Sequence, residues 1–260
     1  MAIKIRNLDV KINDSHILKK FNLNVKNGEF VNIIGPNGSG KTTLLRAILN
    51  IVNSESKKLE VFNKNIYKMS RKEISRNISY LPQIKKSFTS IEVRDFLLFS
   101  RFPYLGILSS YKEKDHEIIN KIAREFEIKT LLNRNIKTLS GGELQRVLIA
   151  SALVQETDII FLDEPTTFLD PNHRWEIFNL LYEINKKENK TIVLVTHFLD
   201  YILNYGDKVV AIKDGELFFD NKVSYIIENE SLIKNLYNFE IEIFKKNNKI
   251  FIDYPEKRVL

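Results

Sequence analysis

A glycine-rich segment at residues 35–42 has the residue types and spacing of a phosphate-binding loop. It reads GPNGSGKT, after a predicted buried strand at 30–35 and at the start of a predicted helix at 41–49. Glycines let successive backbone N–H groups turn toward an anion, and the helix N-terminus adds the positive end of its dipole. A glycine-rich turn without a ligand is the alternative, which the flanking strand and helix disfavour. The predicted phosphate-binding residues are Gly35, Pro36, Asn37, Gly38, Ser39, Gly40, Lys41, Thr42 and Thr43.

Within this loop three side chains have separate predicted roles. We expect Lys41 to contact the β- and γ-phosphates of a nucleotide and the Thr42 hydroxyl to hold Mg²⁺. Thr43 would add a donor to the α-phosphate. The chemistry predicted for this segment is therefore nucleotide binding with Mg²⁺.

Two adjacent carboxylates follow another apolar run, IIFLDEP at 159–165. Adjacent side chains of an extended backbone point apart, so Asp163 could serve Mg²⁺ while Glu164 reaches a water poised to attack the γ-phosphate. A solvated acidic pair at the end of a strand is the alternative interpretation. The phosphate loop in the same chain favours the catalytic one.

A second anion site is predicted at the start of another helix. Ser140, Gly141 and Gly142 precede a helical run from about Glu143, an arrangement in which a serine caps the helix and glycines leave its first amides open. One nucleotide needs only one γ-phosphate site per chain. The second site therefore requires a separate explanation.

The segment LSGGELQR at 139–146 resembles the signature of ATP-binding-cassette (ABC) ATPases. Further elements match in family order: YLPQ places Gln83 as the Q-loop glutamine, TTFLD places Asp170 in the D-loop, and VTH places His197 as the switch histidine. The first 34 residues resemble the family's antiparallel β-subdomain, so that the resemblance covers about residues 1–222. For His197 alone, a strand-end histidine without a catalytic role is the alternative.

This resemblance implies a head-to-tail homodimer in which Ser140 and Gly142 of one subunit close on the ATP held by Lys41 of the other. It also implies that His197 orients the γ-phosphate and the water, and that Gln83 binds the metal and links the site to the helical subdomain. The chain departs from the family pattern at two positions: Ile12 stands at the usual adenine-stacking aromatic, and the bulky Phe168 stands in the D-loop.

The elements that position these residues are predicted from hydrophobic periodicity. Strands alternate with helices around the motifs, which favours a parallel crossover sheet, whereas the first thirty residues alternate as short antiparallel strands. This pattern predicts an α/β fold, and the resemblance to ABC ATPases implies a P-loop NTPase cassette with a RecA-like core, an N-terminal antiparallel β-subdomain and an inserted helical subdomain. The expected limits within one ATPase domain, 1–260, are 1–84 and 156–222 for the core, 85–155 for the helical subdomain, and 223–260 for a tail of helix and hairpin.

The amino-acid composition excludes several classes of protein and of binding site. The chain has 260 residues, 43% of them hydrophobic and 28% charged, and no cysteine, which excludes disulfides and thiolate metal sites. The net charge of +7 is mild for this length, so nucleic-acid binding is not expected. The N-terminus lacks the apolar core of a secretory signal, and the apolar runs are of strand length. Any membrane role must therefore be peripheral, and the family resemblance implies a cytoplasmic protein that is peripheral on the inner face of the cell membrane.

Residues 90–110 resemble the segment after the Q-loop in ATPases of iron-siderophore, haem and cobalamin importers, with Arg101, Pro103 and Tyr104 matching and Ser100 in place of glycine. The resemblance implies a homodimer beneath a permease, served by an extracytoplasmic binding protein, with the permease received near residues 84–110. Arg94, Phe102 and Tyr104 are candidate contacts. An ordinary loop between helices is the bland alternative for this segment, and a soluble cassette ATPase that drives cofactor or complex assembly is the alternative function.

Overall fold

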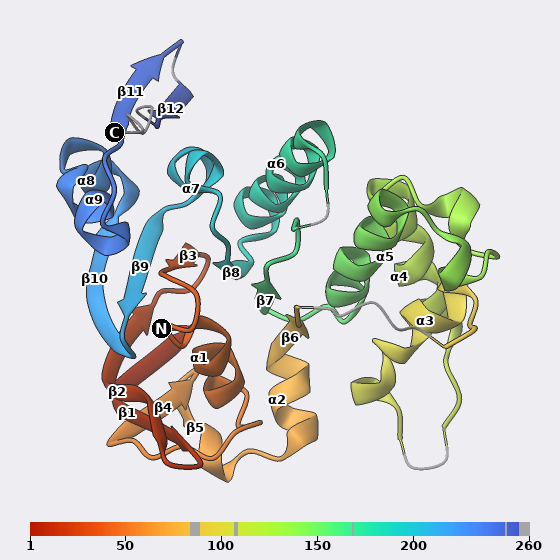
Figure 1. Cartoon of the computed structure of the whole chain (residues 1–260). Coiled ribbons are helices and arrows are strands. Elements are labelled where there is room, and N and C mark those ends of the chain that lie inside the picture. Colours follow the sequence, from red (N-terminus) through yellow and green to blue (C-terminus); the bar gives the residue numbers. More distant parts are fainter. Residues whose placement is uncertain (84–88, 107–108, 168, 248, 255–260) are drawn as a thin grey trace. The chain divides into compact units, whose positions relative to one another are not determined.

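Apolar strands of five or six residues form the centre of the first of two compact units, which comprises Met1–Lys68 and Leu181–Leu260 (Figure 1). The computed structural model describes residues 1–83, 89–106, 109–167, 169–247 and 249–254. In this unit β3 (Phe30–Ile34) lies between β8 (Thr191–Val195) and β9 (Lys208–Lys213), parallel to both. Every residue of β3 and β8 is buried, as expected for parallel strands covered on both faces.

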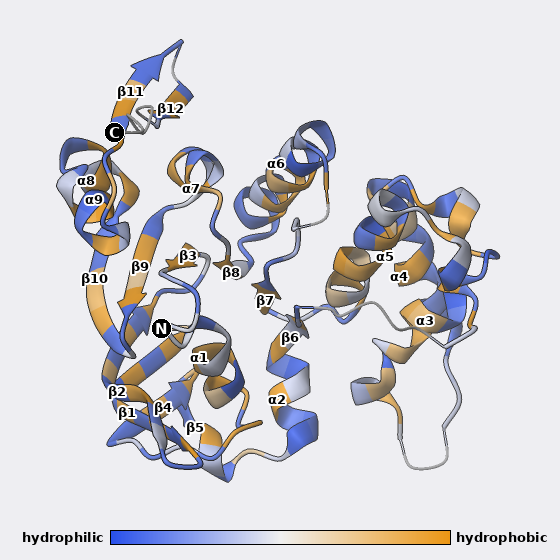
Figure 2. Cartoon of the chain, viewed as in Figure 1, coloured by the Kyte–Doolittle hydropathy of each residue, from blue (hydrophilic) through white to orange (hydrophobic). Residues whose placement is uncertain are grey.

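A hairpin at the edge of this sheet adds β10 (Glu216–Lys222), antiparallel to β9. Its turn is made by Asp214 and Gly215, both with positive φ, 52° and 80°. Figure 2 shows the apolar residues that run along β9. Helix α1 (Lys41–Ile48) follows β3 after the segment 35–40 and buries Leu44, Leu45, Ala47 and Ile48.

A separate antiparallel sheet occupies the N-terminal part of the same unit, in the order β2-β1-β4-β5. Its strands are β1 (Ile3–Ile12), β2 (Ser15–Val25), β4 (Lys58–Val61) and β5 (Lys64–Asn65), and η1 (Ile66–Lys68) follows them. In β1 buried residues alternate with more exposed ones, which is the pattern of a sheet with one face in the core.

The C-terminal part of this unit begins with α7 (Leu199–Tyr205). After β10 come α8 (Val223–Glu228), α9 (Ser231–Tyr237) and the hairpin of β11 (Glu242–Lys246) with β12 (Lys249–Asp253). The tail was expected to hold one helix before its hairpin, and it holds two. Asn229 ends α8 with non-helical φ and ψ of −130° and 60°, which separates the two helices.

The second unit, Met69–Leu180, contains helices around one parallel pair of strands, β6 (Ile78–Leu81) and β7 (Ile159–Asp163). The helices among its described residues are α2 (Arg71–Asn77), α3 (Val93–Phe99), α4 (Glu113–Glu125) and α5 (Gly141–Val154), with the short 3₁₀ turns η2 (Phe102–Tyr104), η3 (Lys129–Leu131) and η4 (Ile136–Thr138). Helix α6 (Pro171–Glu188) begins in this unit and ends in the first.

The apolar stripe predicted for α4 is buried: Ile118, Ile119, Ile122 and Ala123 form its inner face, and Phe126 beyond its end is also buried. The α/β fold class predicted from the sequence is confirmed. The domain limits at 84, 155 and 222 stay a prediction. Among the described residues no helix is both long and apolar enough to cross a membrane.

Candidate active site

The predicted phosphate loop joins β3 to α1 in a backbone conformation that requires glycine. Gly35, Gly38 and Gly40 have φ of 148°, 79° and 104°, which L side chains rarely adopt. At Gly35 a Cβ atom would also lie 2.0 Å from the Ile212 carbonyl oxygen, whereas nothing lies within 4 Å of a Cβ at Gly38. The loop is therefore closely packed at its start and open at its middle, where a ligand would approach.

Lys41 extends back over this loop from the first position of α1. Its Nζ donates to the carbonyl oxygens of Gly35 and Pro36, at 2.8 and 2.9 Å. Gly40 stands at the N-cap of α1 and has no side chain to accept from the helix amides. A cation and a row of backbone amides thus border one segment, which is the chemistry that binds phosphate.

The other predicted loop ligands differ in accessibility. Asn37 is exposed, Pro36, Thr42 and Thr43 are half-buried, and Ser39 is buried with a hydroxyl that has no hydrogen-bond partner among the described residues. These side chains fit a nucleotide phosphate group, because the hydroxyls and amides are donors. Ile12, at the position expected near adenine, ends β1 with 42% of its surface exposed.

His197 lies at the same sheet edge as the phosphate loop. Ile33 of β3 pairs with Val195 of β8 in parallel register, so Gly35 and His197 each lie two residues beyond a paired position. His197 is exposed, and its ring lies 4.1 Å from the Phe198 ring, centroid to centroid. The predicted histidine and phosphate loop are therefore brought together within the first unit.

The second unit brings together the predicted Gln83 and Glu164 in the same way. Leu81 of β6 pairs with Leu162 of β7, and two residues beyond them Gln83 Nε2 donates to Glu164 Oε2 at 2.7 Å. Thr167 Oγ1 donates to the Glu164 carbonyl oxygen at 3.1 Å. The carboxylate that is predicted to activate water is thus held by a side-chain amide from the segment after the neighbouring strand.

Glu164 has a strained backbone. Its φ is 51°, a left-handed conformation that costs a non-glycine residue about 1–2 kcal/mol. Such strain occurs at sites where the surrounding structure fixes a functional side chain. Asp163, one residue earlier, is 1% exposed and accepts from the Tyr80 hydroxyl at 3.4 Å, so the two adjacent carboxylates have different surroundings.

The predicted metal ligands Thr42, Gln83 and Asp163 all offer oxygen, which is the donor that Mg²⁺ prefers. Within the described ranges no three His, Cys, Asp or Glu side chains cluster in a way that could hold a metal ion. This composition fits Mg²⁺ in a nucleotide site, because Mg²⁺ there needs only one or two carboxylates besides substrate phosphates and water. Asp163 supplies one such carboxylate.

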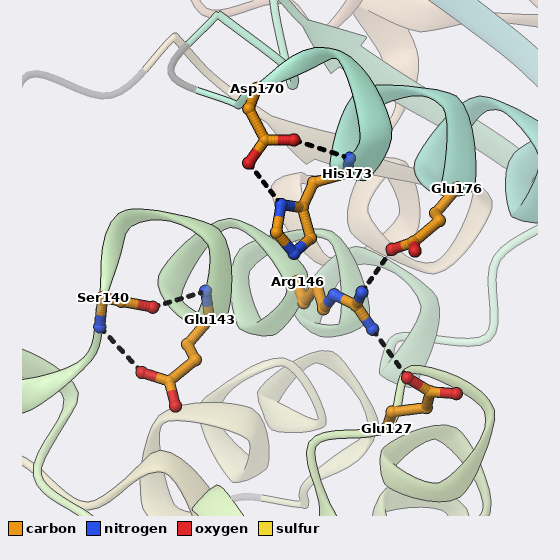
Figure 3. A network of polar contacts seen from close by, with 7 residues as sticks. All are labelled: Glu127, Ser140, Glu143, Arg146, Asp170, His173 and Glu176. Atoms are coloured by element: carbon orange, nitrogen blue, oxygen red, sulfur yellow. Dashed lines mark hydrogen bonds and ion pairs between the residues drawn. The ribbon is translucent and has the colours of Figure 1, made fainter.

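Ser140 is the N-cap of α5 in a complete capping box (Figure 3). Its hydroxyl accepts from the Glu143 amide at 3.3 Å, and Glu143 Oε2 accepts from the Ser140 amide at 2.8 Å. The Ser140 hydroxyl also hydrogen-bonds to the Glu143 carboxylate, and it would exchange that partner for an incoming anion. The backbone amide of Ser140, followed by weaker effects of its side chain and of Arg134, holds the pKa of Glu143 below its usual value.

The two signature glycines leave the start of this helix open. A Cβ at Gly141 would meet nothing within 4 Å, and one at Gly142 would meet only Leu169 Cδ2, at 3.9 Å. Neither has positive φ. Packing does not demand glycine at these two positions, and the absence of side chains keeps the helix amides accessible to a ligand.

A pocket of about 500 Å³ lies in front of this helix start. Asp170, the predicted D-loop residue, lines it and accepts from the His173 amide at 3.0 Å and from His173 Nδ1 at 2.5 Å (Figure 3). Arg146 of α5 lies on the same wall and pairs with Glu127 and Glu176. Phe168, whose role the sequence left open, lies outside the described residues.

The permease is expected to be received near residues 84–110, of which 84–88 and 107–108 lie outside the described residues. Phe102 is 69% exposed and Tyr104 is 37% exposed, whereas Arg94 is half-buried. Arg101, by contrast, is 4% exposed and donates to Asp115. Arg101 is therefore buried within the second unit, whereas Phe102 and Tyr104 are exposed on its surface.

Sequence reasoning missed several residues that hold the site. Tyr80 bonds Asp163, Arg134 pairs with Glu143 at 3.0 Å, and Tyr237 bonds the loop residue Gly35. Tyr80 lies in the same short strand that leads to Gln83, so strand alternation could have indicated it. For Tyr237, which is 202 positions from Gly35, no local pattern exists.

A glycine loop that fits nucleotide phosphates and a capped second helix start that fits an anion define a nucleotide-hydrolysing cassette. Residues 18–167 match the family model described as ABC transporter. The chain belongs to the ABC transporter family, and the ATP hydrolase class predicted from its sequence is confirmed.

Relatives that are named as ATP-binding proteins align with this chain over most of its length. It is 34% identical to the petrobactin import ATP-binding protein FpuD of Bacillus anthracis, over 93% of this chain and 88% of that protein. It is 31% identical to the iron(3+)-hydroxamate import ATP-binding protein FhuC of Bacillus subtilis, over 93% and 90%. A solved dimeric structure of the ATP-binding cassette MJ0796, in a post-hydrolysis state with ADP and Pi, is 29% identical with a TM-score of 0.75, over 85% of this chain and 98% of that one.

Proposed function

We propose that this chain is the ATP-hydrolysing subunit of an importer for an iron-siderophore, haem or cobalamin-type metal chelate. The observation that carries the hydrolytic part is the Gln83–Glu164 contact of 2.7 Å beside the buried Asp163. The import of a metal chelate is supported by relatives that are named for petrobactin and iron(3+)-hydroxamate import.

In this function the first unit binds the phosphates of ATP. The amides of residues 38–43 and the Lys41 ammonium are the donors, and Lys41 would exchange its loop carbonyl partners for phosphate oxygens. The exposed His197 would orient the γ-phosphate and the attacking water, since it lies at the same sheet edge as the loop. Mg²⁺, held by Thr42, Asp163 and Gln83, would neutralise charge on the phosphates.

The second unit supplies the base for the reaction ATP + H₂O → ADP + phosphate. Glu164 would accept a proton from the attacking water, and its strained backbone with the Gln83 and Thr167 hydrogen bonds fixes the carboxylate beforehand. Preorganisation of this kind removes the cost of orienting the base during the reaction. We assign the P–O bond cleavage to in-line attack by that water.

The second anion site is explained by a homodimer. The pocket lined by Ser140, Gly142 and Asp170 offers a hydroxyl donor and open helix amides, which fits the γ-phosphate of ATP bound to the other subunit. The related cassette MJ0796, with ADP and Pi, is dimeric. ATP would thus join two copies, and its hydrolysis would release them.

We place this homodimer on the inner face of the cell membrane, beneath permease subunits that an extracytoplasmic binding protein supplies. The exposed Phe102 and Tyr104 and the half-buried Arg94 are the candidate permease contacts. The apolar rings would fill a groove of the permease, because exposed aromatic side chains carry much of the energy of protein interfaces.

The test is affinity purification of tagged Glu164→Gln protein from its native cells, in mild detergent with ATP. We expect a polytopic membrane protein to co-purify, since the variant would bind ATP without hydrolysing it and would remain an ATP-joined dimer. The matched control is Lys41→Ala, which cannot hold the phosphates and should lose ATP-dependent partners. A soluble scaffold without any membrane protein would refute the importer and leave an assembly ATPase.

A further inference from the structure

The C-terminal tail shares one hydrophobic cluster with the start of the phosphate loop. The cluster contains Ile34, which immediately precedes Gly35, and residues from α7, α8, α9 and β12. Its buried members are Ile34, Leu199, Ile202, Leu203, Val209, Ala211, Phe219, Val223, Ile226, Ile233, Leu236, Ile241 and Ile250. The tail is therefore part of the core on which the loop rests.

Tyr237, the last residue of α9, connects this cluster to the loop by a hydrogen bond. The Gly35 amide donates to the Tyr237 hydroxyl oxygen at 3.2 Å, and the Tyr237 ring packs against the cluster. Burial raises the pKa of Tyr237 to about 12, which the Gly35 hydrogen bond only partly offsets, so the hydroxyl stays neutral at physiological pH. Its lone pair remains available as the acceptor.

Gly35 is the residue at which such a bond has most effect on the loop. Its φ of 148° turns the chain out of β3, and the Ile212 carbonyl blocks any side chain there. Its own carbonyl oxygen accepts from Lys41 Nζ. The amide of Gly35 is thus held by Tyr237 while its carbonyl faces the phosphate-binding lysine.

The hairpin of the tail is fastened in turn to the helix that follows His197. Asn204 of α7 exchanges two hydrogen bonds with Ile250 of β12: Nδ2 donates to the Ile250 carbonyl at 2.8 Å, and Oδ1 accepts from the Ile250 amide at 3.0 Å. Asp200 Oδ1 accepts from the Ile252 amide at 3.1 Å. The tail therefore contacts the strand that precedes the phosphate loop and the helix that follows His197.

We propose that Tyr237 is a positioning residue for nucleotide binding, through which the C-terminal tail holds the first glycine of the phosphate loop. This inference rests on the proposed ATP binding and adds a role for the tail. Loss of the hydroxyl would let the Gly35 peptide move, and a loosened loop would bind the β-phosphate less tightly. Because the loop contacts ADP and ATP alike, the effect is on ground-state and transition-state binding equally.

The experiment compares wild type with Tyr237→Phe, which removes only the hydroxyl and retains the ring in its cluster. The Kd of Mg-ADP is measured by titration calorimetry, and KM and kcat of ATP hydrolysis by phosphate release. The control is Tyr225→Phe in α8, which removes a tyrosine hydroxyl from a half-exposed site of the same tail. Amide hydrogen exchange at Gly35, followed by NMR without nucleotide, reports the bond directly.

We expect Tyr237→Phe to raise the Kd of Mg-ADP and the KM of ATP by about three- to tenfold, with kcat within twofold of wild type. Exchange at Gly35 should accelerate at least about fivefold, whereas Tyr225→Phe should change none of these values. A Kd within twofold of wild type, a fall in kcat alone, or an equal effect of Tyr225→Phe would overturn the inference. If wild type itself fails to bind ADP, the proposed function fails too, which distinguishes the two outcomes.

Discussion

Replacement of Arg101 by methionine should destabilise the second unit strongly. Arg101 is 4% exposed, and its Nε donates to Asp115 Oδ1 at 2.8 Å while Nη1 donates to the Val154 carbonyl at 2.8 Å. Its guanidinium also lies 4.3 Å from the centroid of the Tyr104 ring. One side chain thus joins η2 to α4 and to the end of α5, the helix that begins at the signature.

The magnitude follows from the charge left behind. Asp115 is 8% exposed, and removal of one partner of a buried ion pair costs about 3–5 kcal/mol because the other charge loses its compensation. The additional pair with Glu156 contributes little, since the side chain of Glu156 is 45% exposed. Methionine retains most of the volume, so the cavity adds little. We expect the free energy of unfolding to fall by about 3–4 kcal/mol.

The assay is urea denaturation followed by tryptophan fluorescence. Trp175 is the one tryptophan of the chain and lies in the second unit, in α6, so its signal reports on the unit that contains Arg101. With a slope of about 2–3 kcal/mol per molar urea, the midpoint should fall by about 1–2 M.

The double variant Arg101→Met/Asp115→Leu separates the charge effect from packing. Because no uncompensated charge remains, it should be more stable than Arg101→Met alone by about 2 kcal/mol. A fall in the free energy of unfolding of less than about 1 kcal/mol in Arg101→Met would refute the reasoning. The same would follow if the double variant lost as much stability as Arg101→Met and Asp115→Leu lose separately when added together.

Four other perturbations test the site and its charges. Lys41→Ala should raise the Kd of ATP at least about tenfold, since it removes a charge-assisted hydrogen bond, and tight binding measured by calorimetry would contradict the phosphate loop. Glu164→Gln should lower kcat at least about a hundredfold yet form an ATP-dependent dimer, so a monomer in light scattering with saturating Mg-ATP would contradict the shared site. Ser140→Arg should lower turnover at least about tenfold while each monomer still binds nucleotide, and undiminished phosphate release would argue against the pocket as a phosphate site. Finally, burial raises the pKa of Asp115, but the Lys112 amide and Arg101 outweigh burial and leave that pKa lowered. The stability that the Arg101–Asp115 pair contributes is therefore present above about pH 4 and is lost as the pH falls further. In urea titrations at acid pH, the difference in unfolding free energy between wild type and Arg101→Met should shrink.

The sequence alone indicates those parts of the candidate site that are encoded within one short segment. The loop at 35–42 carries its glycines, Lys41 and Thr42 in fixed spacing, and the backbone angles of Gly35 and Gly40 confirm why glycine stands there. The residues that follow the strands could also be placed from the sequence, because parallel strands bring the residues after their carboxyl ends to one edge of the sheet. The contact of Gln83 with Glu164 joins two motifs that were each found locally.

Tertiary structure alone decided which distant residues support these motifs. Arg101 belonged to a sequence pattern that resembled a subgroup of importers, yet the structure makes it a buried anchor for Asp115 and the end of α5. Tyr237 meets Gly35 across 202 positions of sequence, and Tyr80 meets Asp163 across 83. Motif spacing and strand or helix periodicity describe interactions between neighbours along the chain. Contacts between distant segments depend instead on how whole elements pack, so they became visible only once the chain was folded.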